Sequence, residues 1–245
     1  MSDARLYVIL GSHACRTGML LLRHKGVPFR VVTLPSGMHP MLLRFAGFDG
    51  HNEPFREVNG ETLASVAMID KLGTVPALLM DGDRVQTNIA IARYLDRVRP
   101  ERPLFPADPD ERRKVEEAEK WGDDVLQMVA RRIVLAAGRR GDEVGDDGRL
   151  GPLLMKHKLA RRGFVQVAAR IFAADSEAQD AMRAELPSLL DRVDSYIGAG
   201  VLDGEDLNAA DYMIVTSLAL LCYCPDLATQ VQPRPAFRLV QRVFD

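Results

Sequence analysis

The residues best suited to chemistry lie in a short turn at residues 11–16, between an apolar run and a helical pattern. Ser12 carries a hydroxyl that can donate to a sulfur atom, and Cys15 becomes a nucleophile if it loses its proton. The first N–H groups of a helix lack partners inside it, and they stabilise an anion by about 0.3–1 kcal/mol. The turn therefore suits the binding of a thiolate, although a serine at this position is also an ordinary N-cap.

Two further motifs lie at the ends of predicted strands. Pro76 opens an apolar run at residues 75–80, where a proline removes a hydrogen bond from the sheet. A cis bond between Val75 and Pro76 would explain this position, because it turns the backbone outward to pair with a peptide-like ligand. Gln86 and Thr87 stand between a strand and a helix, where Thr87 can cap the helix while both side chains bond a carboxylate or an amine.

The elements that must position these motifs follow from local composition. Apolar runs predict strands over 6–10 and 29–34, and a helical pattern with a basic last turn lies between them at 14–25. Strand, helix and strand in this order favour a parallel pair and an α/β domain. Asp81 and Gly82 predict a hairpin between 75–80 and 84–85, followed by a helix over 87–98.

Residues 35–71 are interrupted every few positions by glycine or proline, so they predict only short helices and loops. Four prolines within 99–109 cannot continue the preceding helix, and this segment is predicted to be the linker between two domains, 1–98 and 110–245. The second domain shows only helical patterns and is predicted to be a bundle. These patterns cover 110–137, 153–173, 176–197, 208–222 and 235–244, with a solvated connector at 138–151.

Composition limits the classes of function. The 245 residues have a formal net charge of −2, so no basic surface is expected to bind nucleic acid or an anionic membrane. The first residues do not form a signal pattern, and no apolar run reaches the roughly 20 residues of a membrane span, so we expect a cytoplasmic protein. Cys15, Cys222 and Cys224 form neither a disulfide framework nor a metal site, and the last two are interpreted as small core residues.

Taken together, the motifs resemble the glutathione transferase superfamily in their order and spacing. The similarity extends through the proline-rich linker and through residues 206–211, which resemble the capping box and buried aspartate of that family. It covers most of the chain. The resemblance implies a thioredoxin-like N-terminal domain followed by an all-helical C-terminal bundle.

The resemblance also assigns roles to individual residues. It places Ser12 at the thiol-activating position and the backbone of Val75 against the cysteinyl part of glutathione. The remaining assignments are a cis proline at Pro76, the γ-glutamyl end at Gln86 and Thr87, and structural roles for Asn208 and Asp211. Tyr7 is the rival for Ser12, but the tyrosine position of other classes falls nearer Val8, and adjacent strand residues point to opposite faces.

Three departures from the family pattern bear on the thiol site. His13 stands where many members have proline, and it either orients the thiol or contacts solvent, of which we favour solvent contact. Thr74 stands where a longer polar side chain often grips the tripeptide, and the 48–72 connection is longer than usual. On the first helix of the second domain, Trp121, Val125 and Met128 either line an apolar pocket or pack in the core, which is the commoner use of such a stripe.

The resemblance implies an enzyme, a glutathione S-transferase that conjugates or exchanges a glutathione thiolate with a small electrophile. Glutathione would be the co-substrate, with no metal, and the protein would act in detoxification as a cytoplasmic homodimer. Two alternatives stay open. One is a thiol–disulfide or glutathione-lyase oxidoreductase that works through a mixed disulfide at Cys15. The other is a non-catalytic protein-interaction module with the transferase fold.

Overall fold

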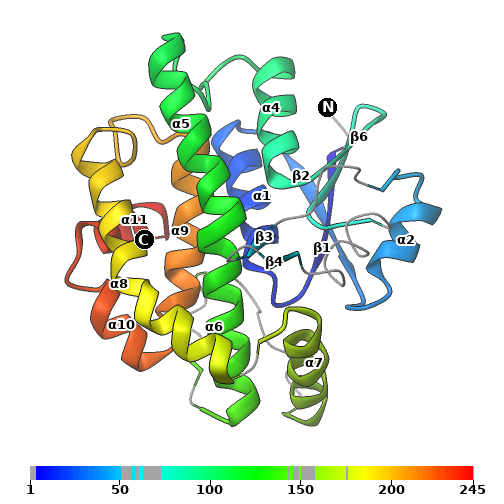
Figure 1. Cartoon of the computed structure of the whole chain (residues 1–245). Helices are drawn as coiled ribbons and strands as arrows, with labels where there is room; N and C mark the ends of the chain where they lie inside the picture. Colours follow the sequence, from blue (N-terminus) through cyan, green and yellow to red (C-terminus); the bar gives the residue numbers. More distant parts are fainter. Residues whose placement is uncertain are drawn as a thin grey trace. The chain divides into compact units, whose positions relative to one another are not determined.

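The computed structural model describes residues 4–50, 57–58, 61–62, 73–142, 144–145, 149, 158–174 and 176–244. The chain falls into two units, Met1–Phe105 and Pro106–Asp245, and the change from one to the other lies inside the proline-rich segment 99–109. The described strands all lie in the first unit, and the described elements of the second unit are helices (Figure 1). The predicted fold class, a thioredoxin-like α/β domain followed by an all-helical bundle, is confirmed.

The first unit is built on a four-stranded sheet in the order β2–β1–β5–β6. β1 (Ala4–Ile9) and β2 (Phe29–Leu34) are parallel, and α1 (His13–His24) connects them. β5 (Ala77–Met80) is antiparallel to β1, and β6 (Asp83–Gln86) is antiparallel to β5. The predicted strand–helix–strand unit and hairpin are therefore both present.

The hairpin turns at the two residues that predicted it. Asp81 has a φ angle of 52° and Gly82 one of 96°. A two-residue loop whose central residues both have positive φ matches the right-handed twist of the strands, and Asp-Gly adopts it readily. Met80 and Asp83 close the loop as a strand pair.

The two faces of the sheet pack against different helices. Leu43 of α2 (His39–Phe45) forms a buried cluster with Phe48 and Ala77. Tyr7 packs on the same cluster, and its ring meets Phe48 edge-on at 5.4 Å between centroids. Because strand residues alternate between faces, Leu6 and Leu78 lie on the face opposite Tyr7 and Ala77. α1 and α4 lie on the other side of the sheet from α2 (Figure 1).

The described part of the segment predicted to hold only short helices and loops also contains strands. It contains α2 and also two short antiparallel strands, β3 (Glu57–Val58) and β4 (Glu61–Thr62). The strands are too short for an alternating pattern to stand out among the glycines and prolines. Most of the 48–72 connection, predicted to be unusually long, lies outside the described residues.

A buried lysine joins the end of α1 to the end of α4 (Asn88–Val98). Lys25 Nζ lies 2.5 Å from Asp96 Oδ1 and donates to the carbonyl oxygens of Arg99 at 2.9 Å and Glu101 at 3.3 Å. Three acceptors satisfy the three donors of the ammonium group, which makes its burial tolerable. The sequence predicted Lys25 as part of a basic last turn of the helix, but not its role in joining α1 to α4.

In the second unit, the helix predicted over 110–137 has a π-helical turn in its middle. α5 (Pro109–Trp121) passes through η1 (Gly122–Leu126) into α6 (Gln127–Arg140). A Cβ atom on Gly122 would lie 2.9 Å from Ile214 Cγ1, so the neighbouring helix can approach closely only because residue 122 lacks a side chain. Since α6 continues to Arg140, the predicted connector at 138–151 began too early.

α9 (Ala209–Leu221) is buried along its whole length, as expected of a helix that is apolar on every side. The other helices of this unit are α7 (Lys158–Ile171), α8 (Ser176–Gly198), α10 (Pro225–Val231) and α11 (Pro235–Phe244). The seven-residue α10 was not predicted, because it is too short to show helical periodicity. A helix was predicted from residue 153, but residues 153–157 lie outside the described part of the chain.

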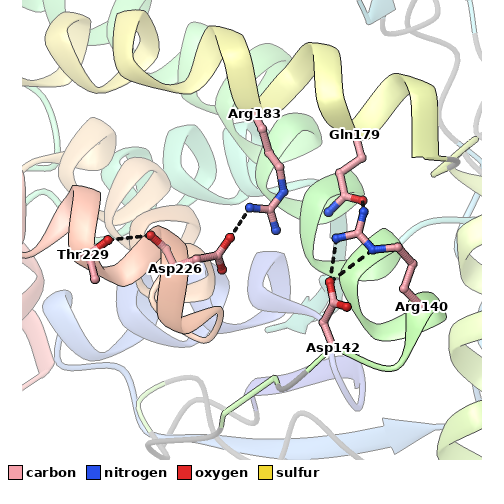
Figure 2. A network of polar contacts seen from close by, with 6 residues as sticks. All are labelled: Arg140, Asp142, Gln179, Arg183, Asp226 and Thr229. Carbon is pink, nitrogen blue, oxygen red and sulfur yellow. Dashed lines mark hydrogen bonds and ion pairs between the residues drawn. The ribbon is translucent and has the colours of Figure 1, made fainter.

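Polar contacts join α6, α8 and α10 at one place (Figure 2). Arg140 binds Asp142 at 2.6 Å and donates to Gln179 of α8. Arg183, one turn further along α8, binds Asp226 in the first turn of α10. Thr229 donates to the Asp226 carbonyl oxygen at 2.7 Å.

Two residues considered for an apolar pocket, and one cysteine interpreted as a core residue, pack inside the second unit. The Trp121 ring meets Tyr196 at 5.7 Å between centroids, and Met128 is fully buried. These two residues therefore serve the core. Cys224 is also buried, and burial raises the pKa of its thiol to about 11, in keeping with its interpretation as a core residue.

Candidate functional site

The turn after β1 places Ser12 at the N-terminus of α1. Gly11 has a φ angle of 81°, which a glycine adopts without strain, and the chain then enters the helix at His13. Ser12 Oγ accepts a hydrogen bond from the Cys15 N–H at 3.3 Å. A hydroxyl that accepts this bond keeps its own proton for donation. Capping and donation to a bound sulfur are therefore compatible at Ser12.

We expected His13 to contact solvent, but it is buried. Its side chain is only 2% exposed, on the same buried side of α1 as Thr17 one turn later. The expectation failed because the N-terminal turn of α1 is covered on the face that carries both residues. Cys15 is also 2% exposed, so its sulfur is shielded in this structure.

The peptide bond between Val75 and Pro76 is cis, as the sequence predicted. β5 begins only at Ala77, so Val75 precedes the paired part of the strand. A Cβ atom on Gly18 would lie 3.2 Å from Pro76 Cβ, so α1 packs directly against the proline because residue 18 lacks a side chain. The cis turn thus lies beside the helix that Ser12 caps.

Thr87 connects the cis turn to α4. Its N–H donates to the Pro76 carbonyl oxygen at 3.2 Å, and its hydroxyl accepts from the Ala90 N–H at 3.3 Å as the predicted cap of α4. Thr87 has a φ angle of 70° and is buried. A β-branched residue in this region of φ is strained by about 1–3 kcal/mol, and such strain clusters at functional sites.

Asn88, the first residue of α4, completes this arrangement and was not singled out in the sequence. Its side-chain amide donates to the Ala14 carbonyl oxygen at 2.9 Å, and both groups are buried. The three predicted motifs are therefore brought together in the first unit by short contacts. Because the burial of Asn88 and its partner depend on tertiary structure, no signal in its own segment identifies this role.

Gln86 is bonded differently from the expectation of a ligand contact. Its Oε1 accepts from the Thr74 N–H at 3.0 Å, and its Nε2 donates to the Asp49 carbonyl oxygen. Both ends of the amide are thus engaged within the protein. Tyr7, the rival of Ser12, packs with Phe48 on the α2 side of the sheet.

Among the residues that the structure describes, no group of three histidine, cysteine, aspartate or glutamate residues could hold a metal ion. No helix in the described part of the chain is long and apolar enough to cross a membrane.

Comparison with known proteins gives one relative by sequence. No protein-family model matches the chain. A probable maleylacetoacetate isomerase of Drosophila melanogaster is 36% identical over 102 residues, which are 42% of this chain and 40% of the relative. The match thus spans about two fifths of the relative's length.

Solved structures match over nearly the whole chain at low identity. A glutathione S-transferase of Ceriporiopsis subvermispora in complex with glutathione is 17% identical, with 98% of each chain covered and a TM-score of 0.65. The beta-etherase LigF of Sphingobium sp. strain SYK-6 is 19% identical, with 99% of this chain and 98% of the other covered and a TM-score of 0.59.

A maleylacetoacetate isomerase of Anaeromyxobacter dehalogenans is 17% identical, with 99% of this chain and 85% of the other covered and a TM-score of 0.54. At these identities the likeness is one of fold. The fold that the resemblance implied is therefore confirmed, and the chain has the fold of these glutathione transferases.

Proposed function

We propose that the protein is a glutathione S-transferase that directs the glutathione thiolate at a small electrophile. The observation that carries this proposal is the contact of three motifs in the first unit: the turn capped by Ser12, the cis turn at Val75–Pro76 and the α4 cap at Thr87. Similar structures of this fold support it, one of them in complex with glutathione.

In the proposed mechanism the site lowers the pKa of the bound thiol. The thiol proton passes to water, and the sulfur anion accepts a hydrogen bond from the Ser12 hydroxyl beside the positive end of α1. The backbone of Val75 pairs with the cysteinyl part of the ligand, and Thr87 binds its γ-glutamyl end. The sulfur then forms a bond to an electrophilic carbon, and the leaving group departs with the electrons of the broken bond.

An isomerase is the nearest variant of this proposal, favoured by the 36% identity to a probable maleylacetoacetate isomerase. The same thiolate would add to a conjugated double bond and leave again after bond rotation, so glutathione would be regenerated. The two reactions are distinguished by mass spectrometry of the products. A transferase consumes glutathione in proportion to product, whereas an isomerase does not.

The alternative that uses Cys15 requires its thiolate to attack the glutathione sulfur of a glutathionylated substrate. A mixed disulfide then forms, and the bond from that sulfur to the rest of the substrate breaks, with its electrons leaving on the released group. A side chain that is 2% exposed must first be uncovered, so we place Ser12 ahead. Loss of turnover in Cys15→Ser, with Ser12→Ala tolerated, would select the oxidoreductase. A protein that binds no low-molecular-weight thiol would instead be the interaction module.

The first test is titration calorimetry of the protein with glutathione, repeated with cysteine as a second thiol. We expect binding of glutathione and weaker binding of cysteine, because cysteine lacks the γ-glutamyl and glycyl contacts. In the same titration, Ser12→Ala should still bind glutathione but release fewer protons. Repeating the titration in two buffers of different ionisation enthalpy measures this release. Equal proton release in both proteins would contradict the role of Ser12.

We also propose that the protein acts in the cytoplasm as a homodimer, and that the two units correspond to domains at 1–98 and 110–245. Sizing chromatography with light scattering tests the dimer, and a monomeric mass at micromolar concentration would refute it.

A further inference from the structure

The segment that follows α4 is bound through its backbone to a lysine at the end of α1. Lys25 Nζ donates to the carbonyl oxygens of Arg99 at 2.9 Å and Glu101 at 3.3 Å, and it pairs with Asp96 at 2.5 Å. The Lys25 side chain is 0% exposed, so its charge depends on these three acceptors instead of water. The contacts that make this burial possible also hold the segment in place.

Two further side chains bind the same segment. The Asp96 carboxylate that pairs with Lys25 also accepts from the Leu104 N–H at 2.8 Å. His24 Nε2 lies 2.9 Å from the Arg102 carbonyl oxygen, which can only accept, so the ring nitrogen donates. Arg102 has a φ angle of 54°, which is costly for a residue with a side chain. Its conformation is therefore imposed by its contacts and not by its own preference.

The segment ends on two buried side chains of the first unit. Leu104 is fully buried, and the guanidinium carbon of Arg93 in α4 lies 4.2 Å from the centre of the Phe105 ring. Asp108 already belongs to the next helix, because its carboxylate accepts from two N–H groups of the first turn of α5. Between the last residue fixed to the first unit and the first residue fixed to α5, two residues remain, 106 and 107.

We propose that Lys25, His24 and Asp96 form a clamp that makes residues 99–105 part of the first unit and limits the hinge between the units to residues 106–107. The predicted linker at 99–109 would then act as a linker over only these two residues. The clamp is a conformational device of the fold, and it operates whichever ligand the thiol site binds.

The state of the clamp sets the length of the connection between the units. At about 3.6 Å per residue, the chain from Phe105 to Asp108 spans at most about 11 Å, whereas the chain from Val98, the end of α4, to Asp108 can span about 36 Å. Opening the clamp therefore lengthens the connection about threefold without breaking a covalent bond. A single buried lysine binds three of the groups that keep the connection short.

Hydrogen exchange of Lys25→Met tests the clamp. Methionine offers no donor, and Asp96 loses its ionic partner, so we expect the Leu104 amide to exchange about a hundredfold faster than in the wild type. The amides of β1 should keep their wild-type rates. Unchanged exchange at Leu104 would overturn the proposal. Acceleration of the β1 amides by the same factor would overturn it too, because the variant would then lower the stability of the whole unit without opening the segment by itself.

Lys120→Met is the matched control. Lys120 pairs with Asp124 at the same 2.5 Å, but its side chain is 72% exposed and the pair lies within one helical turn. An exposed pair contributes little, so this variant should exchange at Leu104 as the wild type does. An equal acceleration in both lysine variants would contradict the role of the buried lysine.

Proteolysis of the folded protein reads the same opening at a different bond. Trypsin does not cut after Arg99 or Arg102, because a proline follows each, whereas a glutamate-specific protease can cut after Glu101. Cleavage follows the population of the open segment. We expect cleavage between residues 101 and 102 to be at least about tenfold faster in Lys25→Met than in the wild type or Lys120→Met, followed by mass spectrometry. Equal rates in the three proteins would refute the clamp.

Two measurements do not depend on the folding of Lys25→Met. Asp96→Asn keeps an oxygen for the Leu104 N–H but removes the charge opposite Lys25, and we expect Leu104 to exchange about tenfold faster with β1 unchanged. A wild-type rate at Leu104 would overturn the proposal. In the wild type itself, the Ala107 amide should exchange at least about a hundredfold faster than that of Leu104. Equal protection of the two amides would show that the hinge is not at residues 106–107.

Discussion

Two helix N-termini in this molecule are capped in contrasting ways. At α1 the Ser12 hydroxyl is half-buried and accepts one bond, from the Cys15 N–H at 3.3 Å. At α9 the Asn208 side chain accepts from two N–H groups of the first turn. The Asp211 carboxylate returns the contact by accepting from the N–H groups of Asn208 and Asp203, both at 2.8 Å.

The difference separates a structural cap from one that can do chemistry. A reciprocal capping box consumes the orphan donors of a helix, and at α9 the carboxylate involved is completely buried. A single serine cap leaves the hydroxyl proton and part of the helix dipole available to a ligand. The sequence resemblance assigned these roles to Asp211 and Ser12, and the following variants measure whether the separation holds.

The largest expected effect is on stability at α9. Asp211→Ala leaves the N–H groups of Asn208 and Asp203 without their acceptor, and we expect the free energy of unfolding to fall by about 3 kcal/mol. Urea unfolding followed by circular dichroism measures this loss. Asp206→Ala, an exposed aspartate in the same loop, is the control and should change little. Equal stability of Asp211→Ala and Asp206→Ala would contradict the structural role of the α9 cap.

The second effect is the pH dependence of that stability. Burial raises the pKa of Asp211 to about 6 from 3.8, although its two backbone hydrogen bonds oppose the rise. Between these values the folded state holds a proton that the unfolded state releases. The stabilising contribution of this group is therefore complete below about pH 4 and is lost as the pH rises to about 6, a change of roughly 2 kcal/mol.

Asp211→Asn isolates this contribution because asparagine does not titrate. From pH 4 to pH 6.5 the unfolding free energy of the wild type should fall relative to that of Asp211→Asn, and above this range the difference should level off. A difference that stays constant over this range would show that Asp211 titrates at its ordinary pKa.

The third effect is on activity at α1. We expect Ser12→Ala to reduce glutathione-dependent turnover about tenfold, or about 1.4 kcal/mol in the barrier, because the thiolate loses a donor. Its stability should fall by only about 1 kcal/mol through the lost cap. Stopped-flow titration of the bound thiolate absorbance should show a raised thiol pKa, and Ser12→Thr should restore it. A stability loss like that of Asp211→Ala with full turnover would reverse the two roles.

Features fixed by neighbouring residues could be predicted from the sequence. Asp81 and Gly82 specify their hairpin because the turn needs positive φ at two adjacent positions. Ser12 and Asn208 were identified as caps because a cap depends on the few residues after it. The position of Pro76 at the start of a strand suggested a cis bond, and the family resemblance implied it.

Features fixed by distant residues could not. The π-helical turn at Gly122 coincides with the close approach of Ile214, which lies far along the chain. His13 was expected in solvent because nothing in its own segment shows that α1 is covered there. The bonds of Gln86 to Asp49 and Thr74 were not predicted, because they depend on tertiary structure.

The smallest expected effect concerns the polar network between α6, α8 and α10 (Figure 2). The Arg183–Asp226 pair joins two helices, as the α9 cap joins a helix to its loop, but the Asp226 side chain is 58% exposed. Burial is the largest single influence and tends to raise the pKa of Asp226, but the hydrogen bond and charge of Arg183, together with backbone N–H bonds, lower it overall. Because water and salt screen an exposed pair, we expect Arg183→Met to cost only about 0.5 kcal/mol.

This loss should shrink in 1 M sodium chloride, whereas the loss in Asp211→Ala should persist, because salt screens exposed charges far more than buried hydrogen bonds. Urea unfolding at low and high salt measures both. Arg113→Met, which removes an exposed pair with Asp110 inside α5, is the matched control. If Arg183→Met were as destabilising as Asp211→Ala at both salt concentrations, burial would not be what distinguishes the α9 cap from the other polar contacts of this unit.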